Sequence, residues 1–356
     1  MQKKIIALAV AALASAGAYA QSNVTVYGIV DAGVANYNIG GKKDQFAVES
    51  GMLSGSRLGF KGAEDLGNGL KAIFALEYAL AVDDNTGVGA LDSGWSSTAA
   101  RQQLVGLSSA KFGTVALGRL QTAGYDFACA YNPVAGGAFD TIGRLGAATV
   151  LSCGSGGRRD NAMAYISPSF AGLTLAVNHA RVTESANTNA THKDAYATIL
   201  HAKYENGPIG AGVIFSKVSG RNADGDNDVT EYGIGASYDF KVVKLFAEYQ
   251  NQRAGDTNHD SKFALGASVP VMAHGTVLAS VGLNKIDSTN TSSSDARAYS
   301  LVYNHALSKR TTLYAGYTFV DNQDNSAKAL AGSNAYGVPQ TGLDGSITAV
   351  GMRHAF

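Results

Sequence analysis

The sequence lacks any long apolar segment after its first 20 residues. A membrane-spanning helix needs about 20 consecutive apolar residues, so membrane helices are excluded from the rest of the chain. Proline and tryptophan are also scarce, at five and one in 356 residues, whereas there are 43 glycines, 17 tyrosines and 13 phenylalanines. Glycine and aromatic residues without proline suit many strands that pack closely together.

An excess of basic charge is missing as well. The chain has 28 basic and 28 acidic residues, and Lys3 and Lys4 belong to a predicted signal peptide, which leaves 26 against 28 and a net charge of −2. A global basic field of the kind that attracts nucleic acid or lipid surfaces is therefore absent. We expect no nucleic-acid partner.

The first 20 residues have the order of a secretory signal peptide. Two lysines precede the apolar run Ile5–Ala18, and the segment ends in Ala-Tyr-Ala at Ala20. A charged start, a short apolar run and small residues at the end are what a signal peptidase substrate shows. We predict residues 1–20 as the signal peptide and residues 21–356 as the mature domain, with an uncleaved anchor helix as the alternative.

Most of the mature chain alternates with a period of two. In Tyr232–Phe240 the even positions hold aromatic or aliphatic residues and the odd positions hold Gly, Gly, Ser and Asp. Such alternation indicates a strand with one apolar and one polar face. The same pattern predicts sixteen strands, near residues 23–35, 53–63, 70–80, 100–108, 114–120, 158–168, 172–182, 194–205, 209–219, 229–240, 243–253, 260–270, 275–286, 295–306, 311–321 and 344–356.

The connections between these strands alternate in length. Tight turns such as 65–69, 110–113 and 206–208 alternate with long polar loops such as 81–99 and 322–343. Short turns at one rim and long loops at the other are typical of outer-membrane barrels. A soluble β-sandwich also alternates apolar and polar residues, but its strands are shorter and it predicts no such alternation of loop length. We therefore predict an all-β protein, a 16-stranded antiparallel transmembrane β-barrel.

The longest connection, residues 121–157, contains both cysteines of the chain. It runs between the fifth and sixth predicted strands, with Cys129 in its first half and Cys153 near its end. Exported proteins meet an oxidising compartment, so a disulfide between Cys129 and Cys153 is expected, and free thiols are the alternative.

Several motifs resemble the beta-proteobacterial branch of the Gram-negative general porins. They include Ser54–Phe74, Val26–Gly33, Phe112–Val115 with Leu117–Arg119, Tyr165–Pro168, Leu307–Thr311 and the terminal Arg353–Phe356. The resemblance implies a homotrimer in the outer membrane of a Gram-negative bacterium, with the third long loop, residues 121–157, folded into the pore. It also implies passive diffusion of small hydrophilic solutes and inorganic ions, contact with outer-membrane lipids and lipopolysaccharide, and recognition of Phe356 by the barrel-assembly machinery.

Charged side chains at the narrowest section of a pore set its ion preference. Arg57 shares strand parity with Gly59 and Lys61, so it is predicted to face the lumen. The resemblance places arginines equivalent to Arg57, Arg101 and one of Arg158 or Arg159 on the barrel wall, and the spacing adds Arg119. Asp126 and Asp140 lie on the loop opposite. Because wall bases outnumber loop acids, we predict a modest anion preference, and the alternative is that the arginines pair with carboxylates and only brace the loop.

Other functions find little support in the sequence. The seven histidines show no metal-ligand spacing, and no nucleophile with its base can be recognised, so we expect neither a cofactor nor an enzyme. A solute-specific channel would show an aromatic ladder along the lumen, whereas the inward positions here hold mainly Gly, Ser, Thr, Asn and charged residues. A barrel that serves as a surface adhesin remains a further alternative.

Overall fold

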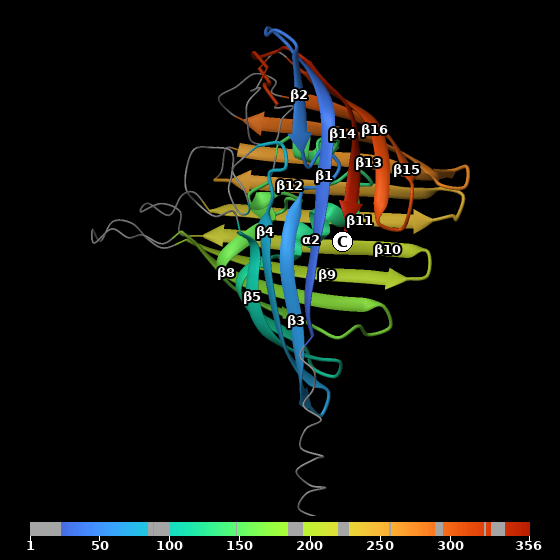
Figure 1. The fold of residues 1–356 in the computed structure, drawn as a ribbon. Coiled ribbons are helices and arrows are strands. Elements are labelled where there is room, and N and C mark those ends of the chain that lie inside the picture. The colour runs from blue at the N-terminus through green and yellow to red at the C-terminus, as the bar shows by residue number, and fades with distance from the viewer. Residues whose placement is uncertain are drawn as a thin grey trace, which may run out of the picture.

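The computed structural model describes residues 23–84, 88, 100–146, 148–183, 195–219, 228–255, 258–288, 295–323, 325–328 and 339–356. These residues form one antiparallel sheet that closes on itself as a barrel (Figure 1). The predicted signal peptide lies outside the described residues. Within the described ranges no helix is both long and apolar enough to cross a membrane.

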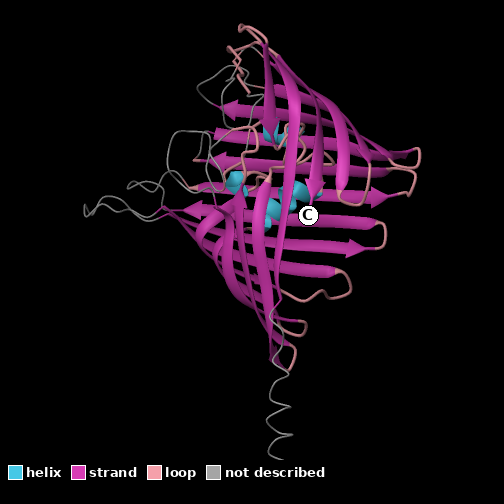
Figure 2. Ribbon diagram, viewed as in Figure 1, coloured by secondary structure: helices cyan, strands magenta, loops and turns pink. Residues whose placement is uncertain are grey.

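Strands make up nearly all of the regular structure (Figure 2). Their bounds are β1 Asn23–Ile39, β2 Gln45–Ser50, β3 Arg57–Gly67, β4 Leu70–Ala79, β5 Ala100–Ser109, β6 Gly113–Gln121, β7 Arg158–Ile166, β8 Leu173–Thr183, β9 Ala195–Asn206, β10 Ile209–Ser219, β11 Val229–Asp239, β12 Lys244–Ala254, β13 Asn258–Val271, β14 Gly275–Ser288, β15 Ala296–Ala306, β16 Thr311–Asn322 and β17 Gly345–Ala355. In the described chain, three short helical elements lie between β6 and β7, namely α2 Ala123–Ala130, α3 Thr141–Arg144 and the 3-10 turn η1 Ser155–Gly157.

The period-two pattern of the sequence separates the two faces of the sheet. In β11, Ile234 and Tyr238 are 57% and 43% exposed, whereas Glu231, Gly233 and Gly235 on the other parity are buried. Exposed apolar residues form the outer face of the closed barrel, and the alternate residues form its inner face. The predicted antiparallel barrel of sixteen strand positions is confirmed.

The second predicted strand differs from the observed one. Instead of one strand at 53–63, β2 and β3 both pair with β1, so seventeen strands of the described chain fill sixteen positions. The chain leaves the sheet at residues 51–56, where Gly51 has a φ of +76°. The buried Asp31 on β1 stabilises this break, because its Oδ2 accepts hydrogen bonds from the amides of Leu53 at 3.0 Å and Ser54 at 2.6 Å.

The barrel closes where the two ends of the chain meet. β17 pairs with β1 from Ile29 opposite Ala355 to Ile39 opposite Gly345. Gly28 and Phe356 continue this ladder through two reciprocal backbone hydrogen bonds of 3.1 Å.

Apart from the second predicted strand, each predicted strand begins within two residues of the start of the observed strand.

The main apolar cores lie between the inner face and the connection from β6 to β7. We call residues 121–157 the 121–157 loop. One core joins Phe127, Tyr131 and Val150 of the loop to inner-face residues of β9, β10 and β11, and another joins Val134, Phe139 and Leu145 to β1, β14, β15, β16 and β17. Each buried side chain of this size contributes about 1.5–3 kcal/mol. Apolar packing therefore fixes the position of the loop along the wall.

Candidate functional site

The 121–157 loop begins and ends at one point of the wall. Thr122 caps α2: its Oγ1 accepts a hydrogen bond from the Gly124 amide at 3.2 Å and donates to the Gly157 carbonyl at 2.8 Å. Asn178 on β8 accepts a hydrogen bond from the Ala123 amide at 3.0 Å. A Thr at this position satisfies helix amides that would otherwise have no partner. The two ends of the loop are thereby tied to each other and to the neighbouring strand.

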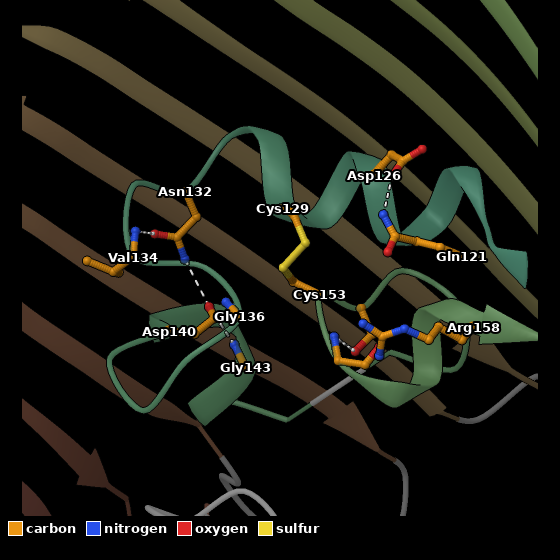
Figure 3. Close-up of a disulfide and its surroundings, with 12 residues drawn as sticks. Gln121, Asp126, Cys129, Asn132, Val134, Gly136, Asp140, Gly143, Cys153 and Arg158 are labelled. Atoms are coloured by element: carbon orange, nitrogen blue, oxygen red, sulfur yellow. Dashed lines mark hydrogen bonds between the residues drawn. A yellow bond between two sulfur atoms is a disulfide. The ribbon is translucent and has the colours of Figure 1, made fainter. Parts of the chain in front are cut away.

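The predicted disulfide is confirmed. Cys129 at the end of α2 is bonded to Cys153, with their Cα atoms 5.0 Å apart (Figure 3). The bond joins the first arm of the loop to the segment that leads into β7. A crosslink that closes a loop of this length stabilises the fold by about 3 kcal/mol in the chain-entropy account.

Asp140 lies inside the loop and not on an open surface. It is buried at the start of α3, and its carboxylate accepts hydrogen bonds from the Gly136 amide at 2.9 Å, the Gly143 amide at 3.0 Å and the Asn132 side chain at 3.0 Å (Figure 3). Burial raises the pKa of the Asp140 carboxyl and lowers the pKa of the nearby Arg144 guanidinium, while their mutual attraction opposes both shifts. Asp140 therefore caps a turn of the loop instead of presenting charge to solvent.

Glycines on the inner face of the wall make room for aromatic rings of the loop. A Cβ added at Gly235 would come within 2.1 Å of the Tyr131 ring, so only glycine lets this ring lie on β11. Gly233 and Gly316 make the same room for Phe127 and Phe139. Hydrogen bonds add to this contact: Ser300 donates to the Phe139 carbonyl at 2.7 Å, and the hydroxyls of Thr141 and Ser280 are 2.8 Å apart.

Three of the predicted arginines come together on the opposite side of the loop. Arg57 on β3, Arg101 on β5 and Arg158 on β7 interact electrostatically with one another. Arg158 donates to the Gly154 carbonyl at 3.1 Å and lies over the Tyr125 ring, 4.5 Å from its centroid. Arg158 is the first residue of β7, and its side chain thus connects this strand to α2.

Two further charged residues complete this group, and sequence reasoning missed both as site residues. Glu77 on β4 accepts from Arg101 Nε at 2.7 Å and from the Tyr27 hydroxyl at 3.1 Å. Arg353 on β17 donates to Ser54 at 2.8 Å and interacts electrostatically with Arg57. Strand parity could have indicated both, because Glu77 alternates with exposed Leu76 and Arg353 with exposed Met352.

We call Arg57, Arg101, Arg158, Arg353 and Glu77 the arginine cluster. It holds four guanidinium groups and one carboxylate, and the guanidinium is a group that stays charged and offers fixed donors to carboxylate or phosphate. Arg101 Nη2 and Arg158 Nε are buried and lack a hydrogen-bond partner within the described chain.

Two of the predicted site residues lie elsewhere. Arg119 shares the parity of exposed Val115 and Leu117, and it pairs with the exposed carboxylate of Asp160 at 2.6 Å. Asp126 is exposed on α2, accepts from Gln121 at 2.9 Å, and is directed away from Arg158 (Figure 3). The structure therefore brings neither Arg119 nor Asp126 into the arginine cluster.

Arg159 lies beside the cluster and contacts the loop. Its Nη1 donates to the Arg158 carbonyl at 3.2 Å, and its Nη2 donates to the Thr149 carbonyl. Arg159 is paired with Leu120, an inner-face residue of β6. These two contacts hold the Arg159 guanidinium against the loop.

A family model described as Gram-negative porin matches residues 7–325. The chain belongs to the Gram-negative porin family. It is 34% identical to outer membrane porin protein 32 of Delftia acidovorans over 100% of both chains, and 27% identical to an outer membrane porin protein of Bordetella pertussis over 90% of this chain and 95% of that protein. Its structure is similar to that of an anion-selective porin from Comamonas acidovorans, with a TM-score of 0.80, 30% identity, and coverage of 94% of this chain and 100% of the other.

This porin is a channel of the Gram-negative outer membrane, not an enzyme. It allows small hydrophilic solutes and ions to diffuse passively across that membrane. The charged side chains described above therefore act on solutes that diffuse through the channel. They do so through their charge and through the width of the opening that they leave.

Proposed function

We propose that this porin is a general diffusion channel with a modest anion preference, narrowed by the 121–157 loop folded into its pore beside the arginine cluster. The observation that supports this most directly is the excess of positive charge in the cluster, where four guanidinium groups outnumber the carboxylates of Glu77 and of Asp31, which interacts with Arg353. A fixed positive field at a narrow section favours anions over cations. The near-neutral charge of the whole chain does not oppose this, because screening limits the reach of distant charges to about 10 Å.

Ion selectivity in planar bilayers tests the proposal. We expect the wild-type porin to show a chloride-to-potassium permeability ratio above unity in a salt gradient, and Arg158→Gln to lower that ratio. Arg119→Gln is the matched control, because it removes the same charge outside the cluster, and it should leave the ratio near the wild-type value. Cation selectivity of the wild-type channel, or equal effects of the two variants, would contradict the proposal.

We also propose that the porin works as a homotrimer among outer-membrane lipids and lipopolysaccharide, and that the barrel-assembly machinery recognises Phe356. The last strand supports the latter: it ends in an exposed aromatic ring whose backbone is paired with Gly28. Native gel mobility of the purified porin, with and without heating, reports the trimer. Loss of outer-membrane porin after Phe356 is deleted reports the role of the terminal residue.

A further inference from the structure

Glu231 on β11 is a fully buried carboxylate whose recorded partners, within the described chain, are all neutral. It is 0% exposed and lies on the inner face between residues that face the loop. A buried carboxylate needs several donors to offset the loss of its hydration. The identity of these donors indicates what Glu231 does.

The 121–157 loop supplies three of the donors through consecutive backbone amides. Oε1 accepts from the amides of Thr149 and Val150, the latter at 3.2 Å, and Oε2 accepts from Val150 at 2.9 Å and Leu151 at 3.3 Å. Successive amides converging on one anion form a nest, and hydrogen bonds to a charged acceptor are stronger than those between neutral groups. One side chain of the wall therefore holds three consecutive amides of the loop, those of residues 149–151.

Two neighbouring strands hold the carboxylate in place. Ser216 on β10 donates to Oε2 at 3.1 Å, and Gln252 on β12 donates to Oε1 at 2.9 Å. Gln252 also lies 2.8 Å from the Thr149 hydroxyl and donates to it. We call Ser216, Glu231 and Gln252 the clamp.

The clamped peptide leads directly to the arginines. The peptide group between Thr149 and Val150 joins both partners, because its amide donates to Glu231 and its carbonyl accepts from Arg159 Nη2. Arg159 in turn donates to the carbonyl of Arg158, which belongs to the arginine cluster. A continuous chain of hydrogen bonds thus runs from the inner face of β11 through the loop to two adjacent arginines of β7.

We propose that Glu231 is a positioning residue for ion selectivity: it holds Thr149 so that the Thr149 carbonyl fixes the Arg159 guanidinium beside the arginine cluster. This inference rests on the proposed function, because it requires that charges near the cluster act on passing ions. Without the clamp, the turn at residues 149–151 loses its acceptor and Arg159 loses a fixed partner. The Arg159 guanidinium then occupies a range of positions, and its effect on the chloride-to-potassium permeability ratio becomes smaller.

A double-mutant cycle on the full-length porin tests this coupling. We expect Arg159→Gln to lower the chloride-to-potassium permeability ratio in the wild-type background, and the size of that fold-change to shrink about twofold when Glu231→Gln is already present, because coupled residues are not additive. Glu231→Gln should also increase open-channel current noise. Equal effects of Arg159→Gln in both backgrounds, or no effect of Arg159→Gln in the wild type, would overturn the inference.

Glu248→Gln supplies the matched control. Glu248 is another buried inner-face carboxylate, and its recorded hydrogen bond comes from Gln250 at 2.7 Å rather than from the loop. The Arg159→Gln effect should be unchanged in the Glu248→Gln background, and an equal loss there would show that the coupling does not depend on contact with the loop and would refute the clamp. If Glu231→Gln does not assemble, Gln252→Leu replaces it in the cycle, with the same direction and the same deciding outcomes.

Failure of this inference differs from failure of the proposed function. Arg158→Gln tests the cluster without involving the clamp. A normal Arg158→Gln effect with an additive cycle rejects only the role of Glu231, whereas a cation-selective wild type rejects the proposed function and this inference together.

Discussion

The inner face of the barrel has two unlike regions. Along β9–β16 it carries glycines and aliphatic residues on which the loop packs, whereas along β3–β5, β7 and β17 it carries the arginine cluster. The period-two pattern produces the packed region, whereas Arg101 of the cluster lies at a register shift between β4 and β5. The packed wall therefore holds the loop in place, through apolar contacts and the Glu231 carboxylate, while the other wall places positive charge beside the loop.

The largest expected effect comes from disturbing the packed region. Phe139 is 1% exposed and lies over Gly316. Phe139→Ala should cost about 3–5 kcal/mol of packing energy in the loop. Because the strands keep their hydrogen bonds, the barrel should still assemble, with a larger and noisier single-channel current.

The exposed Phe112 provides the control for that variant. It lies in the turn between β5 and β6, 69% exposed, so Phe112→Ala should leave current and heat stability unchanged. If both variants leave the current unchanged, packing does not determine the position of the loop, and the contrast between the two regions fails.

A smaller effect is expected from the disulfide. Its removal costs about 3 kcal/mol at most in the chain-entropy account, and the loop keeps its other anchors. Cys129→Ser with Cys153→Ser, or reduction of the wild type, should leave the barrel assembled and raise current noise less than Phe139→Ala does. Reductant should change nothing further in the double variant. Identical noise in reduced and oxidised wild type would show that the crosslink does not restrain the loop.

The smallest effect distinguishes the two loop acids. Asp140→Ala removes a helix cap with three donors and should cost about 1–2 kcal/mol, measured as a lower melting temperature of the refolded porin. Asp126→Ala removes an exposed carboxylate, so the melting temperature should remain that of the wild type. A reversed order would mean that Asp140 does not stabilise the loop.

The positions of the strands could be predicted from the sequence because each strand shows its own alternation of apolar and polar residues. The break between β2 and β3 could not be predicted in this way. It is stabilised by hydrogen bonds from the amides of Leu53 and Ser54 to Asp31, which lies some twenty residues earlier and on another strand.

Strand parity puts Arg57 on the same face as Gly59, and in the structure Arg57 belongs to the arginine cluster. The spacing that added Arg119 overlooked parity, because Arg119 alternates with the buried Leu120 and shares the parity of exposed Leu117.

The loop was harder to predict because its chemistry depends on distant partners. Asp140 stands directly before Thr-Ile-Gly, a local capping signal that was available, yet its donors from Asn132 and Gly136 depend on how the loop turns. Glu231 gives no local signal at all. Its role comes from three amides that lie about eighty residues away.

The contacts of the loop also constrain the order of assembly. The Ala138 amide donates to the Met52 carbonyl near the start of the chain, and the ring of Phe139 lies 6.3 Å from that of Tyr314 near its end. Pairing of β1 with β17 joins residues more than 300 positions apart, which is a slow, non-local step. Residues of the 121–157 loop also share one apolar core with residues of β1 and β17, so the loop can act as an internal template that aligns the first and last strands before the ring is sealed.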